Sequence, residues 1–335
     1  MGTAHRPPVV ATLPRSLYLE TTNRCDSKCQ TCIRTFQSLE PPADLTLEQV
    51  KAIASQFPVL DRVVLHGIGE PLLNVEIFAI VAYLKTRSAT VLFNSDAISL
   101  TAKRALKLIE SGLDEYRVSM DAATRQTYRK LRGVDQFDRV VVNVRRLVAL
   151  ERERSRSAPR VSLWFTASRA NLHELMAFVR LAGDLGVPEV YVQRLVFNGL
   201  GLATAENALH GRLEQQEREL LDQAEELART LGLTLRASGL TTPLVSLKGE
   251  TSRPRPWAGC QRPWTLSYVT ANGNVVPCCI SPWVARDYQA LILGNAFAEP
   301  FAEIWNGERY RRFRIDFESA SPPDPCRGYG LRWSI

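Results

Sequence analysis

The sequence has 335 residues, of which 45% are hydrophobic and 23% charged, a soluble, globular balance with length for one large core and a smaller module. Its net charge of +7 is spread along the chain and not gathered with aromatic residues in one basic patch, so we expect no nucleic-acid partner. No apolar run reaches the roughly 18 residues of a membrane span, and residues 1–14 lack the apolar centre of a signal peptide, so we expect a flexible leader, a cytoplasmic location and no membrane partner.

Apolar, β-rich runs alternate with helical patterns from residue 16 to residue 193. The first strand is predicted at 16–21, and Thr46 opens the first helix because Thr46 and Gln49 form a T-x-x-Q capping box. The remaining predicted elements, in chain order, are a strand at 62–66, a helix at 75–87, a strand at 90–93, a helix at 101–111, a strand at 115–119, a helix at 137–152, a strand at 161–166, a helix at 172–185 and a strand at 189–193.

Six strand–helix units of this length predict the α/β class, with parallel strands and right-handed crossovers. We expect them to form a partial, TIM-like (β/α)6 barrel over residues 15–205. The reactive groups of such a barrel collect at the C-terminal ends of its strands. The candidate residues that follow or end the predicted strands are Cys25, Gly67, Gly69, Glu70, Asn94, Ser119 and Gln193.

The pattern changes after the sixth unit. Residues 213–231 form a charged amphipathic pattern, which predicts a connecting helix within 206–245. Residues 251–264 are rich in proline, arginine and tryptophan, and several cysteines lie in or beyond this stretch. We therefore predict a separate C-terminal module over 246–335.

Three cysteines are clustered as Cys25-x-x-x-Cys29-x-x-Cys32 on the loop after the first predicted strand. In a reducing cytosol, clustered thiols indicate metal binding or catalysis and not disulfides. Three thiolates can hold three irons of a [4Fe–4S] cube, which leaves the fourth iron open for a ligand. The spacing favours this site over zinc, which would want a fourth Cys or His nearby. It also favours it over a thioredoxin-like Cys29–Cys32 pair, which leaves Cys25 unexplained.

This cysteine spacing, in this position of a six-unit α/β chain, resembles the radical S-adenosylmethionine (SAM) superfamily. The resemblance covers roughly residues 16–200. Gly67-Ile68-Gly69-Glu70-Pro71 is similar to the family's G-x-G-E-P segment, whose backbone approaches the methionine amino group of SAM. The physical reasoning agrees, because glycines permit close backbone approach.

Three further segments support the resemblance. They are Phe93-Asn94-Ser95-Asp96, which departs from the family's T-N-G pattern at Ser95; Val118-Ser119-Met120-Asp121, similar to S-x-D; and Tyr128 through Arg132-Gly133, similar to Y-x-x-x-R-G. The resemblance implies that Asn94, Ser119 and Arg132 hold the SAM carboxylate or ribose. Gln193 is a candidate for contact with adenosine or substrate. A helix cap, a turn or a sheet-end hydrogen bond is the structural alternative for these residues.

The resemblance also implies a mechanism. SAM binds the open iron, and one electron from the reduced cluster cleaves SAM into methionine and a 5′-deoxyadenosyl radical. That radical abstracts a hydrogen atom from the substrate, while the protein supplies orientation and excludes water. The family implies a flavodoxin or ferredoxin as the electron donor, and a basic surface suits an acidic partner.

The C-terminal cysteines resemble the SPASM/twitch extension of this superfamily, which carries an auxiliary [4Fe–4S] cluster. Cys260, Cys278 and Cys326 are the implied ligands, and Asn272-Gly273 predicts a turn before Cys278. The usual final C-x-x-C pair has Tyr329 in its second place. The fourth ligand therefore stays open among Cys279, Tyr329, substrate and solvent. Cys279 has two further interpretations, as a hydrogen-atom donor to a product radical and as a buried thiol without chemistry.

The substrate is the least determined part of the prediction. The barrel and the module use all the length, which leaves no room for an N-terminal peptide-recognition domain and favours a small molecule. The layout is similar to the cytosylglucuronate decarboxylases of nucleoside-antibiotic biosynthesis. In that interpretation the radical takes a sugar hydrogen, the carboxylate is lost, and Arg169 or Arg194 holds the carboxylate, with a surface ion pair as the alternative for each arginine. The other candidates are a sugar dehydrogenase, epimerase or dehydratase, a peptide maturase, and a zinc-stabilised binding protein.

Overall fold

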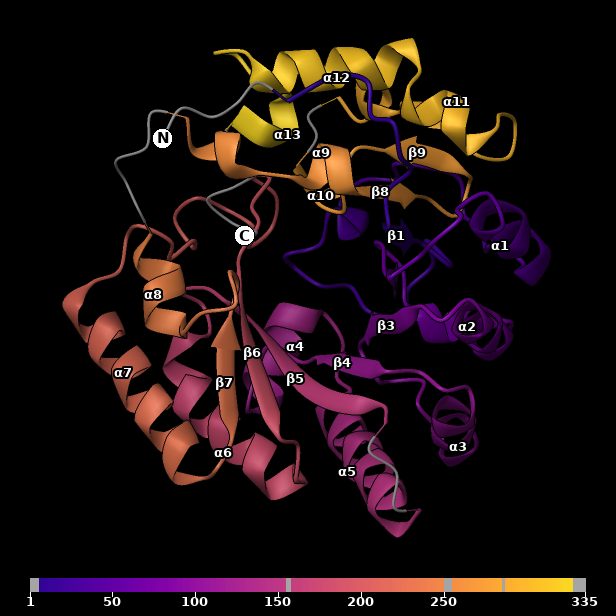
Figure 1. The fold of residues 1–335 in the computed structure, drawn as a ribbon. Helices are drawn as coiled ribbons and strands as arrows, with labels where there is room; N and C mark the ends of the chain where they lie inside the picture. The colour runs from indigo at the N-terminus through magenta and orange to yellow at the C-terminus, as the bar shows by residue number, and fades with distance from the viewer. Residues whose placement is uncertain (1–5, 155–157, 250–254, 285–286, 328–335) are drawn as a thin grey trace. The chain divides into compact units, whose positions relative to one another are not determined.

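The computed structural model describes residues 6–154, 158–249, 255–284 and 287–327 (Figure 1). The chain divides into two compact units. The first unit is made of residues 1–25, 38–92 and 253–332. The second unit is made of residues 26–37, 93–252 and 333–335.

The strands of the first unit come from both ends of the sequence. They are β1 (Ser16–Leu19), β2 (Arg62–Leu65), β8 (Leu266–Val269), β9 (Asn274–Val276) and β10 (Gly294–Asn295), in the spatial order β10–β9–β8–β1–β2. Strand β1 pairs in parallel with β2 on one side and with β8 on the other. The pairs β8–β9 and β9–β10 are antiparallel. The C-terminal module therefore contributes a direct neighbour to the first strand of the chain.

The first helix of this unit begins where the capping signal predicts. The Thr46 hydroxyl accepts from the N–H of Gln49, and the Gln49 side chain accepts from the N–H of Thr46, which confirms the capping box. The helices are α1 (Leu47–Ala54), α2 (Ile77–Thr86), α9 (Arg262–Thr265), α10 (Ser281–Val284), α11 (Phe301–Trp305), α12 (Glu308–Glu318) and α13 (Asp324–Arg327), with 3-10 turns at Pro71–Leu73, Pro256–Gly259 and Gln289–Leu291.

The second unit is a parallel α/β arrangement. Its strands β4 (Glu115–Ser119), β5 (Arg160–Ala167), β6 (Glu189–Arg194) and β7 (Thr234–Ala237) lie side by side in that order (Figure 1), and every neighbouring pair is parallel. Strand β3 (Thr90–Ser95) carries the chain from the first unit into the second. The helices are α3 (Ala102–Glu110), α4 (Arg125–Arg132), α5 (Phe137–Glu153), α6 (Leu175–Leu185), α7 (Gln215–Thr230) and α8 (Pro243–Lys248), with 3-10 turns at Ile33–Thr35 and Leu172–Glu174.

The predicted α/β class is confirmed, with six strand–helix units from β1 to the end of α7 and mostly parallel pairing. Residues 206–245, predicted to hold one connecting helix, contain α7 and also β7, which pairs with β6 and extends the parallel strands. Helix α4 was not predicted either, because its charged sequence lacks a broad apolar stripe. Among the described residues, no helix is long and apolar enough to cross a membrane.

The predicted leader at 1–14 is corrected where the structure describes it. The guanidinium of Arg6 pairs with Glu318 over 2.7 Å and lies 4.0 Å from the ring centroid of Trp264. Backbone carbonyls of the same segment accept hydrogen bonds from Trp264, Arg314, Asn306 and Trp305, over 2.8, 2.8, 2.9 and 3.0 Å. Residues 6–12 are therefore held against the C-terminal helices, because their polar backbone groups meet buried side-chain donors there.

The predicted Asn-Gly turn is confirmed as the connection between β8 and β9. Gly273 has a φ of +81°, and its N–H donates to the Thr270 carbonyl over 2.9 Å. A Cβ at this position would lie 2.6 Å from the Phe297 ring, so only glycine fits. The hairpin delivers Cys278 immediately after β9.

Candidate functional site

The loop after β1 carries the three clustered cysteines, and its residues 26–37 belong to the second unit. Cys29 and Cys32 are half-buried, and the N–H of Cys32 donates to the Cys29 carbonyl over 3.1 Å. The Thr35 hydroxyl donates to the same carbonyl over 2.8 Å. Cys25, the last residue assigned to the first unit at this point, is half-buried as well. Hydrogen bonds thus order the backbone of the loop that carries the thiols.

Helix α4 ends against this loop, through the Y-x-x-x-R-G segment. The N–H groups of Lys28 and Gln30 donate to the carbonyls of Arg132 and Leu131, over 3.0 and 2.7 Å. Gly133 has a φ of +68°, and a Cβ there would lie 2.1 Å from the Lys28 carbonyl oxygen. Only glycine permits this approach, so the glycine of the segment serves to dock α4 on the cysteine loop.

Arg132 lies buried at the end of α4. Its Nη1 forms an ion pair with the carboxylate of Asp121 over 3.0 Å, and Asp121 also accepts from the N–H of Thr166 over 2.7 Å. The Nε of Arg132 is buried without a hydrogen-bond partner among the described residues. A spare buried donor on a cation fits an anionic group, such as the carboxylate of SAM that the resemblance implies. The contact itself remains a prediction.

The electrostatics of Cys29 bear on metal binding. Burial raises the pKa of the Cys29 thiol to about 12, and the guanidinium of Arg132 opposes this rise. Iron binds the thiolate, so the metal has to displace the thiol proton. A buried cation beside Cys29 favours the charged form that the metal requires. The residues of this loop therefore fit an iron–sulfur cluster.

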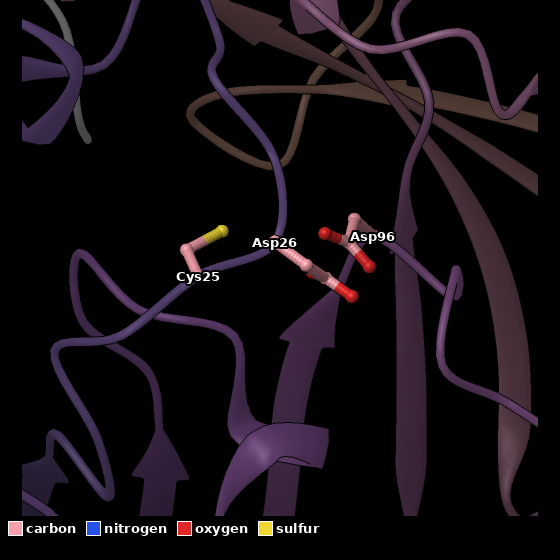
Figure 2. Close-up of side chains that lie close together, drawn as sticks. All are labelled: Cys25, Asp26 and Asp96. Carbon is pink, nitrogen blue, oxygen red and sulfur yellow. The ribbon is translucent and has the colours of Figure 1, made fainter.

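Two carboxyl groups that the sequence analysis did not propose as site residues meet at this loop, of which Asp96 is buried and Asp26 half-buried. Figure 2 shows Asp26, the residue after Cys25, and Asp96, which follows β3, pointing toward one another. Burial and the neighbouring Asp26 together raise the pKa of Asp96 to about 6. Ser27 donates to Asp96 over 2.7 Å, and Ser99 donates to Asp26 over 3.0 Å. The four side chains join the cysteine loop to the end of β3, and no sequence signal distinguishes them from ordinary loop residues.

The remaining predicted cofactor residues of the second unit lie at strand ends. Ser119 ends β4 opposite Trp164, Gln193 lies in β6 opposite Thr166, and Asn94 is the penultimate residue of β3. All three candidates are half-buried. Parallel strands bring such side chains to one edge of the sheet, which is the position that the sequence predicts. Their contacts with SAM stay predictions.

The glycine-rich segment after β2 belongs to the first unit, and its glycines make room for protein groups. A Cβ on Gly67 would lie 2.2 Å from the Glu20 carboxylate, and a Cβ on Gly69 would lie 2.0 Å from the Thr22 carbonyl oxygen. The buried Glu70 caps the following 3-10 turn by accepting from the N–H of Leu72 over 3.0 Å. The segment therefore packs on the chain that leads into Cys25, and this packing explains the glycines without a cofactor.

We expect Gly67→Ala to destabilise the protein by about 1–3 kcal/mol, the usual cost of overpacking a closely packed site. The added methyl group would overlap the carboxylate and the Cγ of Glu20. In a Glu20→Ala background the same substitution should cost much less, and urea unfolding of the four proteins measures this coupling. An equal cost of Gly67→Ala in both backgrounds would show that Glu20 is not what requires the glycine.

The three predicted auxiliary ligands line one cavity of the C-terminal module. Cys260 follows the 3-10 turn at Pro256–Gly259, Cys278 follows β9, and Cys326 lies in α13. The cavity is partly open to solvent and has a volume of about 330 Å³, and its other lining residues are Arg262, Pro263, Pro277, Ile280, Phe313, Phe317 and Pro325. Three soft thiol ligands in an apolar cavity fit an iron–sulfur cluster. Tyr329, the departure from the expected fourth ligand, lies outside the described residues.

Arg262 is the charged side chain of this lining. Burial raises the pKa of Cys260 to about 11 and also raises the pKa of Cys326, and Arg262 opposes both rises. The cation therefore favours the thiolate forms that a metal cluster would need.

Cys279 is not one of the described residues that line this cavity. Its side chain packs with Tyr18 against a buried cluster of Tyr268, Val276 and Tyr288. Burial raises the pKa of Cys279, whereas Arg262 and a hydrogen bond with Tyr18 lower it. This surrounding favours the two roles predicted for Cys279 other than cluster ligand, and does not decide between them.

The two arginines predicted to hold a substrate carboxylate have different surroundings. Arg169 forms ion pairs with Glu214 and Glu217 over 2.8 and 2.6 Å, which is the structural alternative stated for it. Arg194 is buried at the end of β6, and its Nε donates to the Ser246 hydroxyl over 2.9 Å. Burial lowers the pKa of Arg194 to about 10. Of the two, Arg194 remains the better candidate.

Comparison with protein families gives two matches along the chain. A family model described as "Radical SAM superfamily" matches residues 19–158, which include the cluster at Cys25, Cys29 and Cys32. A model described as SPASM, "Iron-sulfur cluster-binding domain", matches residues 260–328. The second match includes the three cysteines of the C-terminal cavity.

Curated relatives match over most of both chains. An "AdoMet-dependent heme synthase" of Methanosarcina barkeri is 27% identical over 90% of this chain and 85% of its own. A "PqqA peptide cyclase" of Streptomyces rochei is 27% identical over 94% and 81%. A "Probable GTP 3′,8-cyclase" of Metallosphaera sedula is 27% identical over 89% of each chain.

Solved structures share the fold. SuiB of Streptococcus suis bound to S-adenosylmethionine aligns with a TM-score of 0.70 and 16% identity, over 91% of this chain and 68% of that chain. The chain anSMEcpe with bound AdoMet aligns with a TM-score of 0.64 and 14% identity, over 92% and 81%. At such identities the similarity concerns the fold alone.

Proposed function

Because this chain belongs to the radical SAM superfamily and carries a SPASM iron–sulfur domain, we propose that it removes a hydrogen atom from a sugar- or nucleoside-type acid. The observation that supports it most is that six of the cysteines form two sets of three, one set on the loop after β1 and the other around a single cavity of the C-terminal module. A reducing protein such as a flavodoxin or ferredoxin, and hence a cytoplasmic location, are part of the proposal.

The cofactors supply the chemistry that starts the reaction. When bound, the [4Fe–4S] cluster and SAM together supply reductive cleavage of SAM and hydrogen abstraction. Cys25, Cys29 and Cys32 would hold the cluster, and Arg132 would hold the SAM carboxylate with its spare Nε–H. Cys260, Cys278 and Cys326 would hold the auxiliary cluster.

The finer proposal is decarboxylation of a cytosylglucuronate-like sugar acid. The relative named as a GTP cyclase supports a nucleoside-type substrate, because it matches this chain over most of both lengths. Buried Arg194 at the end of β6 would hold the substrate carboxylate, since a guanidinium binds a carboxylate in a bidentate way.

Peptide maturation is the second candidate. The relative named as a PqqA peptide cyclase is 27% identical over 94% of this chain, and SuiB has also been solved bound to its precursor peptide SuiA. Both proteins act on or bind peptides by name, and both match over most of this chain. Sugar oxidation, epimerisation and dehydration remain within the same radical chemistry.

Anaerobic reconstitution tests the proposal. We expect a brown protein that releases 5′-deoxyadenosine when dithionite and SAM are added, followed by liquid chromatography. Sugar nucleosides with a uronic acid and short peptides are then offered separately, and mass spectrometry is expected to find loss of CO2 from the sugar acid. A processed peptide with an unchanged sugar acid would favour the second candidate. A colourless protein with stoichiometric zinc would overturn the radical mechanism.

A further inference from the structure

Glu20 connects two parts of the first unit that have different predicted roles. It follows β1 directly, and only 3% of its surface is exposed. Its Oε2 accepts from the N–H of Ile68 over 2.8 Å, and Ile68 is the middle of the glycine-rich segment. The same oxygen accepts from the hydroxyl of Tyr268 over 2.8 Å, and Oε1 accepts from the N–H of Ala271 over 3.3 Å. Both of these donors belong to the β8–β9 hairpin that precedes Cys278.

A buried carboxylate has to be offset by the donors around it, because its removal from water is costly. Burial raises the pKa of Glu20 to about 7, and the contacts with Ile68, Tyr268 and Ala271 oppose the rise. Hydrogen bonds to a charged acceptor are about twice as strong as neutral ones. These three donors are therefore held in position by one buried carboxyl group.

The fit around Glu20 leaves little freedom. Gly67 leaves no space for a Cβ beside the carboxylate, and the backbone N–H of Glu20 donates to the Val269 carbonyl over 2.9 Å. The glycine-rich segment and the hairpin thus both donate to the Glu20 carboxylate, and the hairpin is also bonded to the Glu20 backbone. A displacement of the hairpin has to move the acceptor of the Ile68 N–H.

We propose that Glu20 is a positioning residue, which sets the glycine-rich segment for SAM and makes that setting depend on the C-terminal module. This inference rests on the proposed function, because SAM binding at that segment is what the family resemblance implies. Glu20 acts through the backbone of residues 67–69 and through Tyr268, and does not touch the reacting atoms.

Glu40 provides a matched control of the same chemistry. Its carboxylate accepts from the side-chain amides of Asn272 and Asn274 over 2.9 and 2.8 Å, and from the hydroxyl of Tyr288 over 2.7 Å. These donors all lie in the C-terminal module. Glu40 therefore also binds the module, through donors other than the glycine-rich segment.

The experiment measures SAM binding by the reconstituted protein, with calorimetry under anaerobic conditions. Glu20→Gln should raise the Kd for SAM roughly tenfold, because the loss of one charged hydrogen bond is of that size. Tyr268→Phe, which removes one donor from the module side, should raise it by about threefold. Glu40→Gln should stay within about twofold. In turnover, the KM for SAM should rise in Glu20→Gln, whereas kcat at saturating SAM should not change. This is the pattern expected when the lost interaction stabilises the ground state and the transition state equally.

Hydrogen exchange supplies a second readout that needs neither SAM nor activity. In Glu20→Gln, and to a lesser degree in Tyr268→Phe, the amide of Ile68 should exchange faster, whereas in Glu40→Gln it should not. Equal effects of Glu20→Gln and Glu40→Gln on SAM affinity, or unchanged exchange at Ile68, would overturn the positioning role. A wild-type protein that holds its clusters but binds no SAM would overturn the proposed function, and exchange at Ile68 would then decide the role of Glu20 alone.

Discussion

Replacing Cys29 with serine should abolish reductive cleavage of SAM, with 5′-deoxyadenosine release falling by more than about 100-fold. Loss of an outer-shell partner of a metal ligand already costs 10–100-fold, and Cys29 is expected to be a direct ligand. Without it, the loop retains two thiols for a cluster that needs three. Chromatography of the anaerobic reaction measures the nucleoside, and the iron content of the reconstituted protein measures cluster loss.

Gln30→Ala is the matched control for this substitution. Gln30 lies on the same loop, and its side chain makes one exposed hydrogen bond, to the Lys28 carbonyl over 3.1 Å. The backbone bond from Gln30 to Leu131 does not need the side chain. We expect nucleoside release within about twofold of wild type, because a substitution that removes only an exposed side-chain contact has a small effect. If Cys29→Ser retained wild-type release, the cluster would not depend on this loop as predicted.

Replacing any one of Cys260, Cys278 and Cys326 with serine should halve the iron content, from roughly eight to about four per chain. The three thiols line one cavity, so the loss of any one opens the same site. The cluster on the loop after β1 has separate ligands, and SAM cleavage without substrate should survive. Iron and sulfide analysis, with a melting curve for each variant, measures the outcome.

Cys279→Ser distinguishes cluster ligation from the other roles of this residue. Cys279 packs beside Tyr18 and does not line the cavity, so the variant should keep roughly eight irons. A fall to about four would make Cys279 the fourth ligand, against the geometry of its surroundings. A wild-type protein with only about four irons would refute the second cluster altogether.

Most of the predictions that can be compared with the structure came from the cysteine spacing and the turn and capping signals. The Asn272-Gly273 turn and the capping box at Thr46 are local, so a few residues determine them. The convergence of Cys260, Cys278 and Cys326 on one cavity could be expected only from resemblance, because nothing local to each thiol indicates the others.

The role of Glu20 could not be predicted in this way. A glutamate near the end of a short predicted strand looks like an exposed strand end, and its partners Ile68 and Tyr268 are 48 and 248 residues away. The explanation for a glycine at position 67 also changed, because it depends on the distant side chain of Glu20. The sequence suggested approach to a cofactor, and the structure adds a carboxylate that occupies the space of a Cβ. The carboxylates that pair with Arg169 lie more than forty residues along the chain and were equally hidden.

The pairing of β1 between β2 and β8 has a consequence for biogenesis. Ribosomes add about 5–20 residues per second, so one edge of β1 stays open for on the order of ten seconds or more before its partner is made. An open strand edge is a template for wrong pairing, which makes β1 a site where a chaperone would protect the nascent chain. Cys326, the last of the three predicted auxiliary ligands, is also made only near the end of synthesis. Insertion of the auxiliary cluster therefore has to follow translation of the module.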